Sequence, residues 1–282
     1  MRIAIINGKV CTPEEARISV YDRGFLYGDS IFETVRTYNG KAFALQEHLS
    51  RLARSAERLF IELPIALEAI AAEVEQGIAQ AQNPESFARI MITRGSGALG
   101  LDPALAHAPS RVILIEPFAP PPPEAYRDGI GAITFRTVRA TDDTPAAGAK
   151  VANYLTSVLA IREAKKQGAV EAFIIDGRGH VLEGTTSNVF LVKDGRLVTA
   201  PEESGILSGI TRAYLLRAAE RLGVAIDVRD IREEELIGAD ELFISSTLRE
   251  VLPVVRLDGR AVGGGKPGAL TRQIHGEFRR AT

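Results

Sequence analysis

Residues 150–188 read KVANYLTSVLAIREAKKQGAVEAFIIDGRGHVLEGTTSN, and they predict a helix followed by two short strands. After Asn153, apolar residues recur at spacings of three and four, and Gly168 is a typical stop, which predicts a helix between these positions. The runs Glu171–Ile175 and His180–Glu183 have strand character and flank a turn rich in Asp and Gly. The stretch therefore places a lysine directly before a helix and a glutamate at the end of a strand.

Lys150 and Glu183 are the two groups that pyridoxal phosphate chemistry requires. The lysine amine forms a Schiff base with the cofactor, and the carboxylate keeps the pyridine nitrogen protonated so that the ring accepts electrons. Spacing alone does not decide this. Residue counting favours a solvated surface lysine at position 150 and an ordinary strand-end charge at position 183.

The motifs around these two residues resemble those of the class IV (fold type IV) pyridoxal-phosphate aminotransferases. The chain carries A-K-x-x-N-Y-L at residues 149–155, E-G-x-x-S-N-V-F-x-V-K-D-G at residues 183–195 and S-G-I-T-R at residues 208–212. The family comprises branched-chain and D-amino-acid aminotransferases and aminodeoxychorismate lyases, and the resemblance extends in order from about Asn7 to Gly268. It implies an α+β fold of the D-amino-acid aminotransferase-like type, with two α/β-type domains, largely antiparallel sheets with flanking helices, and the cofactor between the domains.

Length and composition indicate a soluble globular protein of two domains. At 282 residues the chain is long for one domain, and 45% hydrophobic with 25% charged residues is ordinary for a globular protein. A net charge of −2 offers no basic patch, so we expect no nucleic-acid partner, and the four scattered histidines suggest no metal site. The single cysteine suits a reducing cytosol, and no stretch is long and apolar enough for a signal peptide or a membrane span. We therefore expect a cytoplasmic protein with no membrane association.

Hairpin signals and a proline run organise the rest of the chain. Asn7-Gly8 and Asn39-Gly40 each lie between two strand-like runs, which predicts antiparallel pairing and excludes a Rossmann domain in this half. Helices are expected at Glu47–Phe60 and about Ile65–Gln80, and Pro120–Pro123 is a stiff break in composition. We place an N-terminal α/β domain at residues 1–118, a proline-rich linker at 119–127 and a C-terminal cofactor-binding domain at 128–282.

Two places in the sequence are candidates for holding the cofactor's phosphate. The first expected helix carries Arg51, Arg54 and Arg58 off its apolar stripe, and periodicity does not separate them. The family's H-x-x-R-L pattern picks out Arg51, whose guanidinium suits phosphate oxygens. A helix that begins after Gly209 presents free amides to an anion, although an ordinary Ser N-cap explains the same residues.

The resemblance extends the phosphate site to the end of the strand expected at Glu241–Ser245, where a threonine hydroxyl and amide hold phosphate in the family. The resemblance also implies that Lys150 is the catalytic residue. The cofactor-binding candidates are then Arg51, Lys150, Glu183, Ser187, Asn188, Gly209, Ile210, Thr211, Ser246 and Thr247.

Two further motifs resemble segments that line the substrate side of the cofactor in the family. They are D-R-G-x-x-Y-G-D at residues 22–29 and F-E-x-x-R at residues 32–36, where branched-chain enzymes usually have glycine in place of Thr34. Arg89 and Arg94 are candidate carboxylate ligands, and charges alternating along a strand edge explain either one equally well. The substrate-binding candidates are Tyr27, Phe32, Thr34, Arg36, Arg89, Arg94 and Leu248.

Two glycine-rich stretches imitate nucleotide sites. Residues 95–100 fit G-x-G-x-x-G, but the long helix and the later acidic residue of a dinucleotide site do not follow. Residues 263–266 read GGGK but lack the first glycine and the Ser/Thr of a phosphate-binding loop. We reject both readings.

The expected function is therefore an aminotransferase acting on a small amino acid and a keto acid. The best guess is branched-chain L-amino acids with 2-oxoglutarate, because F-E-x-x-R and the Arg89 strand resemble that branch. The K-V-A-N spacing at residues 150–153 resembles the other branches, so a D-amino-acid aminotransferase is the first alternative and 4-amino-4-deoxychorismate lyase the second. A non-catalytic binding module would lack the lysine or the carboxylate, and both are present. The resemblance also implies a homodimer or higher homo-oligomer.

Overall fold

The computed structural model describes residues 1–139 and 144–282, which divide into two compact units. Unit 1 consists of Met1–Ala119 and Ala149–Asn153, and unit 2 consists of Pro120–Gly148 and Tyr154–Thr282. The first transition between the units falls at the start of the proline run.

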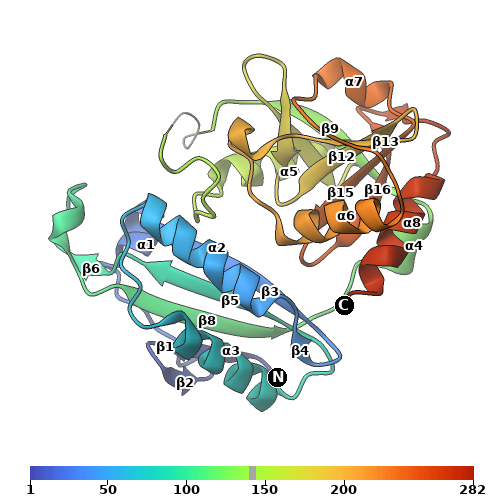
Figure 1. Cartoon of the computed structure of the whole chain (residues 1–282). Helices are drawn as coiled ribbons and strands as arrows, with labels where there is room; N and C mark the ends of the chain where they lie inside the picture. Colours follow the sequence, from blue (N-terminus) through green and yellow to red (C-terminus); the bar gives the residue numbers. More distant parts are fainter. Residues whose placement is uncertain (140–143) are drawn as a thin grey trace. The chain divides into compact units, whose positions relative to one another are not determined.

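Unit 1 contains a six-stranded antiparallel sheet with the strand order β2-β1-β8-β5-β3-β4 (Figure 1). Positive φ angles at Asn7, Gly8, Asn39 and Gly40 show that both Asn-Gly turns form, in the conformation that fits the twist of the flanking strands. The strands are β1 (Ile3–Ile6), β2 (Lys9–Cys11), β3 (Ser30–Tyr38), β4 (Lys41–Ala42), β5 (Ser86–Thr93) and β8 (Ser110–Pro117).

Two helices, α2 (Leu45–Arg58) and α3 (Leu67–Ala81), cover one face of this sheet because each carries an apolar stripe (Figure 1). Leu49 of α2 and Val74 of α3 are fully buried in one cluster with Ile90 of the sheet. The remaining elements of unit 1 are α1 (Arg23–Tyr27), the short hairpin of β6 (Ser96–Gly97) and β7 (Ala106–His107), and the 3-10 turn η1 (Pro103–Leu105).

Unit 2 contains a nine-stranded sheet with the order β11-β10-β9-β16-β15-β12-β13-β14, and β17 pairs with β16. Three strand pairs are parallel (β9–β10, β9–β16 and β13–β14) and the other five are antiparallel. The strands are β9 (Ile130–Arg136), β10 (Glu171–Ile175), β11 (Val181–Gly184), β12 (Asn188–Lys193), β13 (Arg196–Thr199), β14 (Ile226–Val228), β15 (Glu241–Ser246), β16 (Glu250–Leu257) and β17 (Arg260–Ala261).

Both faces of this second sheet are covered. Phe173 and Ile175 of β10 belong to one core cluster, whereas Ala172 and Ile174 belong to another. A strand buried on both faces has a continuous apolar run rather than an alternating one. This run is the reason why the sequence predicted β10. The helices of unit 2 are α4 (Pro123–Arg127), α5 (Leu155–Lys166), α6 (Ile210–Arg221), α7 (Glu233–Ile237) and α8 (Ala269–Arg279), with the 3-10 turn η2 (Glu202–Ser204).

Two segments differ from the expected domain organisation. Residues 123–127 form α4 rather than linker, because Pro123 stands in the first turn of a helix, where its missing N–H has no cost. The segment Ala149–Asn153, expected in the C-terminal domain, belongs to unit 1 because its backbone hydrogen-bonds to β3. From the sequence we also expect a loop at residues 139–149, and its residues 140–143 lie outside the described residues. Within the described part of the chain, no helix has the length and apolar character needed to cross a bilayer.

Candidate active site

Lys150 is held beside the first half of β3, the part of that strand which the short β4 does not reach. The N–H of Phe32 donates to the Lys150 carbonyl (3.0 Å), and the N–H of Ala152 donates to the Ser30 carbonyl (3.1 Å). The Lys150 N–H donates to Ser55 Oγ on α2 (3.1 Å), and its Nζ lies 4.5 Å from the centroid of the Phe32 ring. The backbone of the lysine is therefore fixed, as a residue that must meet a reacting atom requires.

Glu33 is a fully buried carboxylate on β3, and two residues of α2 bind it. Its Oε1 accepts from Arg51 Nε and its Oε2 from Arg51 Nη2, both at 2.7 Å, and Oε2 is also 2.7 Å from His48 Nδ1. A bidentate pair of this kind holds the guanidinium plane in one orientation. Arg51 is thus an oriented cation in unit 1, and its role as a phosphate ligand stays a prediction.

Opposing effects set the charges in this cluster. Burial raises the pKa of Glu33, but the charge and hydrogen bonds of Arg51, together with His48, outweigh burial and lower the pKa to about 2. Burial lowers the pKa of His48 below 6.5; Glu33 opposes this, and the charges of Arg51 and Lys150 lower it further. At neutral pH the cluster is therefore a carboxylate paired with a guanidinium and with a neutral imidazole that donates from Nδ1.

Four of the candidate substrate residues share one face of the sheet in unit 1. Phe32, Thr34 and Arg36 are alternate residues of β3 and project to the same side, and Arg89 of β5 is directly opposite Thr34. The Arg89 guanidinium lies 3.9 Å from the Phe32 ring centroid, and the Arg36 guanidinium lies 4.2 Å from that of Tyr38. This face therefore combines aromatic rings with two cations.

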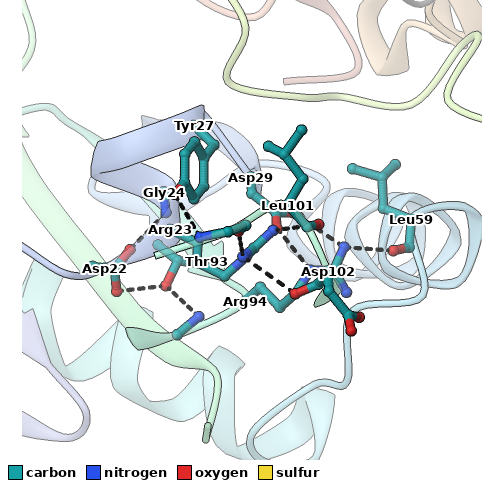
Figure 2. Close-up of polar contacts among 12 residues, drawn as sticks. Asp22, Arg23, Gly24, Tyr27, Asp29, Leu59, Thr93, Arg94, Leu101 and Asp102 are labelled. Atoms are coloured by element: carbon teal, nitrogen blue, oxygen red, sulfur yellow. Dashed lines mark hydrogen bonds and ion pairs between the residues drawn. The ribbon is translucent and has the colours of Figure 1, made fainter. Parts of the chain in front are cut away.

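Arg94, also a candidate carboxylate ligand, has a role in the fold of unit 1 (Figure 2). Its Nε and Nη2 donate to the two carboxylate oxygens of Asp29 at 2.8 and 3.0 Å. Its Nη1 and Nη2 also donate to the carbonyls of Phe60 and Leu59, just after α2, at 2.7 and 2.8 Å. These bonds satisfy carbonyls that a helix end leaves open, and a substrate contact by Arg94 stays a prediction.

Tyr27, the remaining candidate of this unit, contacts the loop that follows β6. The N–H of Gly100 donates to the Tyr27 hydroxyl (3.2 Å). Arg23, buried on α1, donates to Asp29 (2.9 Å) and to the carbonyls of Gly100 (2.7 Å) and Leu101 (3.2 Å), as Figure 2 shows in part. The sequence assigned no role to Arg23, although it stands inside the quoted D-R-G-x-x-Y-G-D motif.

Glu183 lies near the end of β11 in unit 2, where two donors hold its carboxylate. Its Oε1 accepts from Arg139 Nη1 (2.6 Å), and its Oε2 accepts from the Leu207 N–H (3.0 Å). Arg139 also donates to the Gly205 carbonyl (2.9 Å), so it joins this carboxylate to the segment that leads into α6. Arg139 stands in none of the quoted motifs, so no signal in the sequence identified it.

The start of α6 has no side-chain cap, so the Ser N-cap explanation does not apply. Gly209 stands at the N-cap position, and Ser208 Oγ instead donates to Glu202 Oε2 (2.7 Å). Asn188 Nδ2 donates to the Leu207 carbonyl (2.9 Å), and a Cβ on Gly209 would lie 2.0 Å from Asn188 Oδ1, so only glycine fits there. The N-cap residue therefore supplies no side chain to the amides of the first turn, an arrangement that suits an anion.

A comparison with protein families decides the class of this protein. The model of the amino-transferase class IV family matches residues 30–257. The chain belongs to this family. This match and the relatives and solved structures described next confirm the predicted enzyme class, a pyridoxal phosphate-dependent transaminase, and the solved structures confirm the predicted fold class.

Individual relatives and structures agree with the family assignment. The aminotransferase is 38% identical to a putative branched-chain-amino-acid aminotransferase of Methanocaldococcus jannaschii, over 97% of this chain and 94% of that protein. It is 32% identical to a D-alanine aminotransferase of Bacillus licheniformis, over 96% and 93% of the two chains. The crystal structure of the Escherichia coli branched-chain amino acid aminotransferase superposes with a TM-score of 0.93 at 31% identity, covering 99% of this chain and 93% of that one.

The residues of the aminotransferase fit its cofactor. Lys150, whose backbone is fixed, suits the aldehyde of the cofactor. Glu183, held by two donors, suits the pyridine nitrogen, and the uncapped amides at the start of α6 suit the phosphate. Among residues 1–139 and 144–282, no group of His, Cys, Asp and Glu could hold a metal ion. The sequence missed Glu33 and His48, although both are letters of the quoted F-E-x-x-R and H-x-x-R-L motifs.

Proposed function

We propose that this aminotransferase moves the amino group of branched-chain L-amino acids to 2-oxoglutarate. The observation that carries the proposal is the ring of Phe32, with Lys150 Nζ at 4.5 Å and the Arg89 guanidinium at 3.9 Å from its centroid. An aromatic ring beside a guanidinium combines apolar with positive character, which suits both a branched side chain and the second carboxylate of 2-oxoglutarate. A transaminase that accepts these two substrates in turn needs both properties.

The candidate residues divide the work as follows. Pyridoxal phosphate, when bound, supplies an electron sink for the negative charge that develops at the substrate Cα. Lys150 holds the cofactor and moves the proton at that carbon. Glu183 keeps a proton on the pyridine nitrogen through its negative charge, and Arg139 and the Leu207 N–H hold that carboxylate in place.

The phosphate is assigned to four groups of the chain. They are the guanidinium of Arg51, the amides of Ile210 and Thr211 at the start of α6, and the hydroxyl of Thr247. Leu248 in the same turn as Thr247 is assigned to the substrate. Ser187, Asn188, Gly209 and Ser246 are also assigned to binding of the cofactor.

A D-amino-acid aminotransferase is the second candidate function. The relatives named D-alanine aminotransferase, at 32–34% identity over 96–99% of this chain, support it, as does the K-V-A-N spacing after residue 149. A 4-amino-4-deoxychorismate lyase is the next alternative. It is supported by Thr34 and by the R-G-S-G sequence at residues 94–97, because both resemble the lyase branch of the family.

The absorption spectrum of the purified protein, before and after addition of L-leucine or D-alanine, distinguishes these functions. We expect a cofactor band that bleaches with L-leucine and returns with 2-oxoglutarate. Bleaching by D-alanine alone would replace the proposal with a D-amino-acid aminotransferase. Release of pyruvate from 4-amino-4-deoxychorismate without an amino acceptor would indicate the lyase.

A matched pair of variants tests the assignment of the lysine. Lys150→Ala is expected to abolish turnover and the cofactor band, whereas Lys166→Ala, at an exposed lysine paired with Glu163, is expected to keep both. Normal turnover by Lys150→Ala would contradict the assignment.

A further inference from the structure

Two turns of unit 2 carry candidate cofactor ligands, and they come from distant parts of the sequence. The first, residues 184–188, joins β11 to β12 and holds Ser187 and Asn188. The second, residues 246–249, joins β15 to β16 and holds Ser246, Thr247 and Leu248. A hydrogen-bond donor binds phosphate well only if its position is fixed. The contacts that hold these two turns therefore affect binding of the cofactor.

The first turn is organised around Glu171, a carboxylate of β10 with 0% exposure. Its Oε1 accepts from the Thr185 N–H (3.1 Å), and its Oε2 accepts from Ser187 Oγ (3.0 Å). A Cβ on Gly184 would lie 2.2 Å from Ser187 Oγ and 3.2 Å from the Glu171 carboxyl carbon, so the turn is packed directly on the carboxylate.

Arg249 provides the cation that this buried carboxylate requires, and it stands in the second turn. Its Nη2 lies 2.7 Å from Glu171 Oε2 and donates to Thr186 Oγ1 (2.8 Å), and its Nε donates to Ser246 Oγ (3.3 Å). The Arg249 side chain is only 20% exposed. One guanidinium therefore contacts both turns, and its planar fork fixes the geometry of these contacts.

The second turn is also held from its other side. The Tyr126 hydroxyl donates to the Arg249 carbonyl (3.3 Å). Glu250, which follows the turn, is 1% exposed and has a left-handed backbone with φ 52. Its Oε2 lies 2.6 Å from His275 Nε2 and accepts from Arg279 Nε (2.7 Å), both on α8. The backbone around Arg249 is therefore anchored. The two turns adjoin where Asn188 of β12 pairs with Ser245 of β15, and the Arg249 side chain adds contacts beyond this backbone pairing.

We propose that Arg249 and Glu171 are positioning residues for the cofactor phosphate. Their ion pair, with the contacts of Arg249 to Thr186 and Ser246, fixes the Ser246–Thr247 turn against the Thr185–Ser187 turn, so that Thr247 is oriented before the phosphate arrives. The inference rests on the proposed phosphate site. It predicts that loss of the pair weakens recognition of the phosphate more than recognition of the pyridine ring.

The test compares two ligands on the full-length protein freed of cofactor. Titration calorimetry gives one dissociation constant for pyridoxal 5′-phosphate and one for pyridoxal. The constant for pyridoxal divided by the constant for pyridoxal 5′-phosphate reports the contribution of the phosphate to binding. Arg249→Met is expected to reduce this ratio by about tenfold, the effect of a small displacement of binding groups. Arg256→Ala, at an exposed arginine of β16, is the matched control and is expected to leave the ratio unchanged.

A second variant separates positioning from stability. Arg249→Met leaves the charge of Glu171 buried without its partner, which destabilises a fold, whereas Glu171→Gln/Arg249→Met removes both charges and is expected to fold. If this double variant, folded by circular dichroism, also has the reduced ratio, the positioning role is supported. A ratio within twofold of wild type would overturn it. Failure of the wild-type protein to prefer the phosphorylated ligand would instead overturn the proposed phosphate site itself.

Discussion

His48 is a buried imidazole whose pKa the fold lowers, and this gives the free energy of unfolding a pH dependence. Its pKa lies below 6.5 in the folded protein, chiefly because of burial. The unfolded chain therefore binds a proton at this position more readily than the folded one. The stabilisation is complete above about pH 6.5 and is lost as the pH falls below that value.

The prediction is that denaturant unfolding shows a steeper loss of stability between about pH 7 and 5.5 in the wild type than in His48→Gln. The glutamine amide carries N–H donors but does not titrate. His107→Gln, at an exposed histidine, is the control and is expected to behave as the wild type. An identical pH slope in His48→Gln and wild type would contradict the prediction.

At the scale of single elements, the start of α6 depends on a close approach that only glycine permits. A Cβ on Gly209 would lie 2.0 Å from Asn188 Oδ1, so Gly209→Ala must displace the asparagine that holds the Leu207 carbonyl. We expect Gly209→Ala to lower the free energy of unfolding by about 1–3 kcal/mol. We also expect it to weaken binding of pyridoxal phosphate, because the first-turn amides move.

Gly276→Ala is the matched control for this variant. Gly276 lies within α8, and a Cβ there would meet nothing within 4 Å. Alanine favours a helix interior over glycine by roughly 1 kcal/mol, so this variant is expected to be at least as stable as the wild type and to bind the cofactor normally. Thermal unfolding and calorimetric titration measure both effects. Equal cofactor affinity in the two variants would count against an anion site at α6.

At the scale of the whole molecule, we propose a homodimer in the cytoplasm, as the family resemblance implies. Three apolar side chains of α5, Leu155, Val158 and Leu159, are 72%, 59% and 46% exposed in the single chain. Burial of these apolar side chains between two copies of the chain would lower the free energy, which favours association. Light scattering is expected to give at least twice the chain mass of 30.4 kDa. A mass of one chain at micromolar concentration would refute the homodimer.

Much of the fold was predictable because its signals are local. Asn39-Gly40 adopts the positive φ angles that its sequence indicates, and the apolar run Glu171–Ile175 is a strand buried on both faces. The helix expected after Asn153 forms as α5 and ends before Gly168. Turn chemistry, periodicity and helix stops act within a few residues, so the sequence displays them directly.

Part of the candidate site was also present in the sequence, through motifs that match a family. Lys150 and Glu183 were identified as letters of these motifs, and the family match then confirmed the enzyme class. The partners that hold such residues were not identified. The residues that bind Glu183, namely Arg139 and Leu207, lie 44 and 24 positions away from it.

The class of chemistry could be predicted from the sequence alone, because the motifs at residues 149–155, 183–195 and 208–212 resemble those of a known family. The pairing of the charges became apparent only in the folded protein. It placed Arg94 on Asp29, Arg51 on Glu33 and Arg249 on Glu171, each across long separations in the chain. The physical reason is that a buried carboxylate must find a cation wherever the packing of strands and helices brings one, and that choice leaves no periodic trace in the sequence.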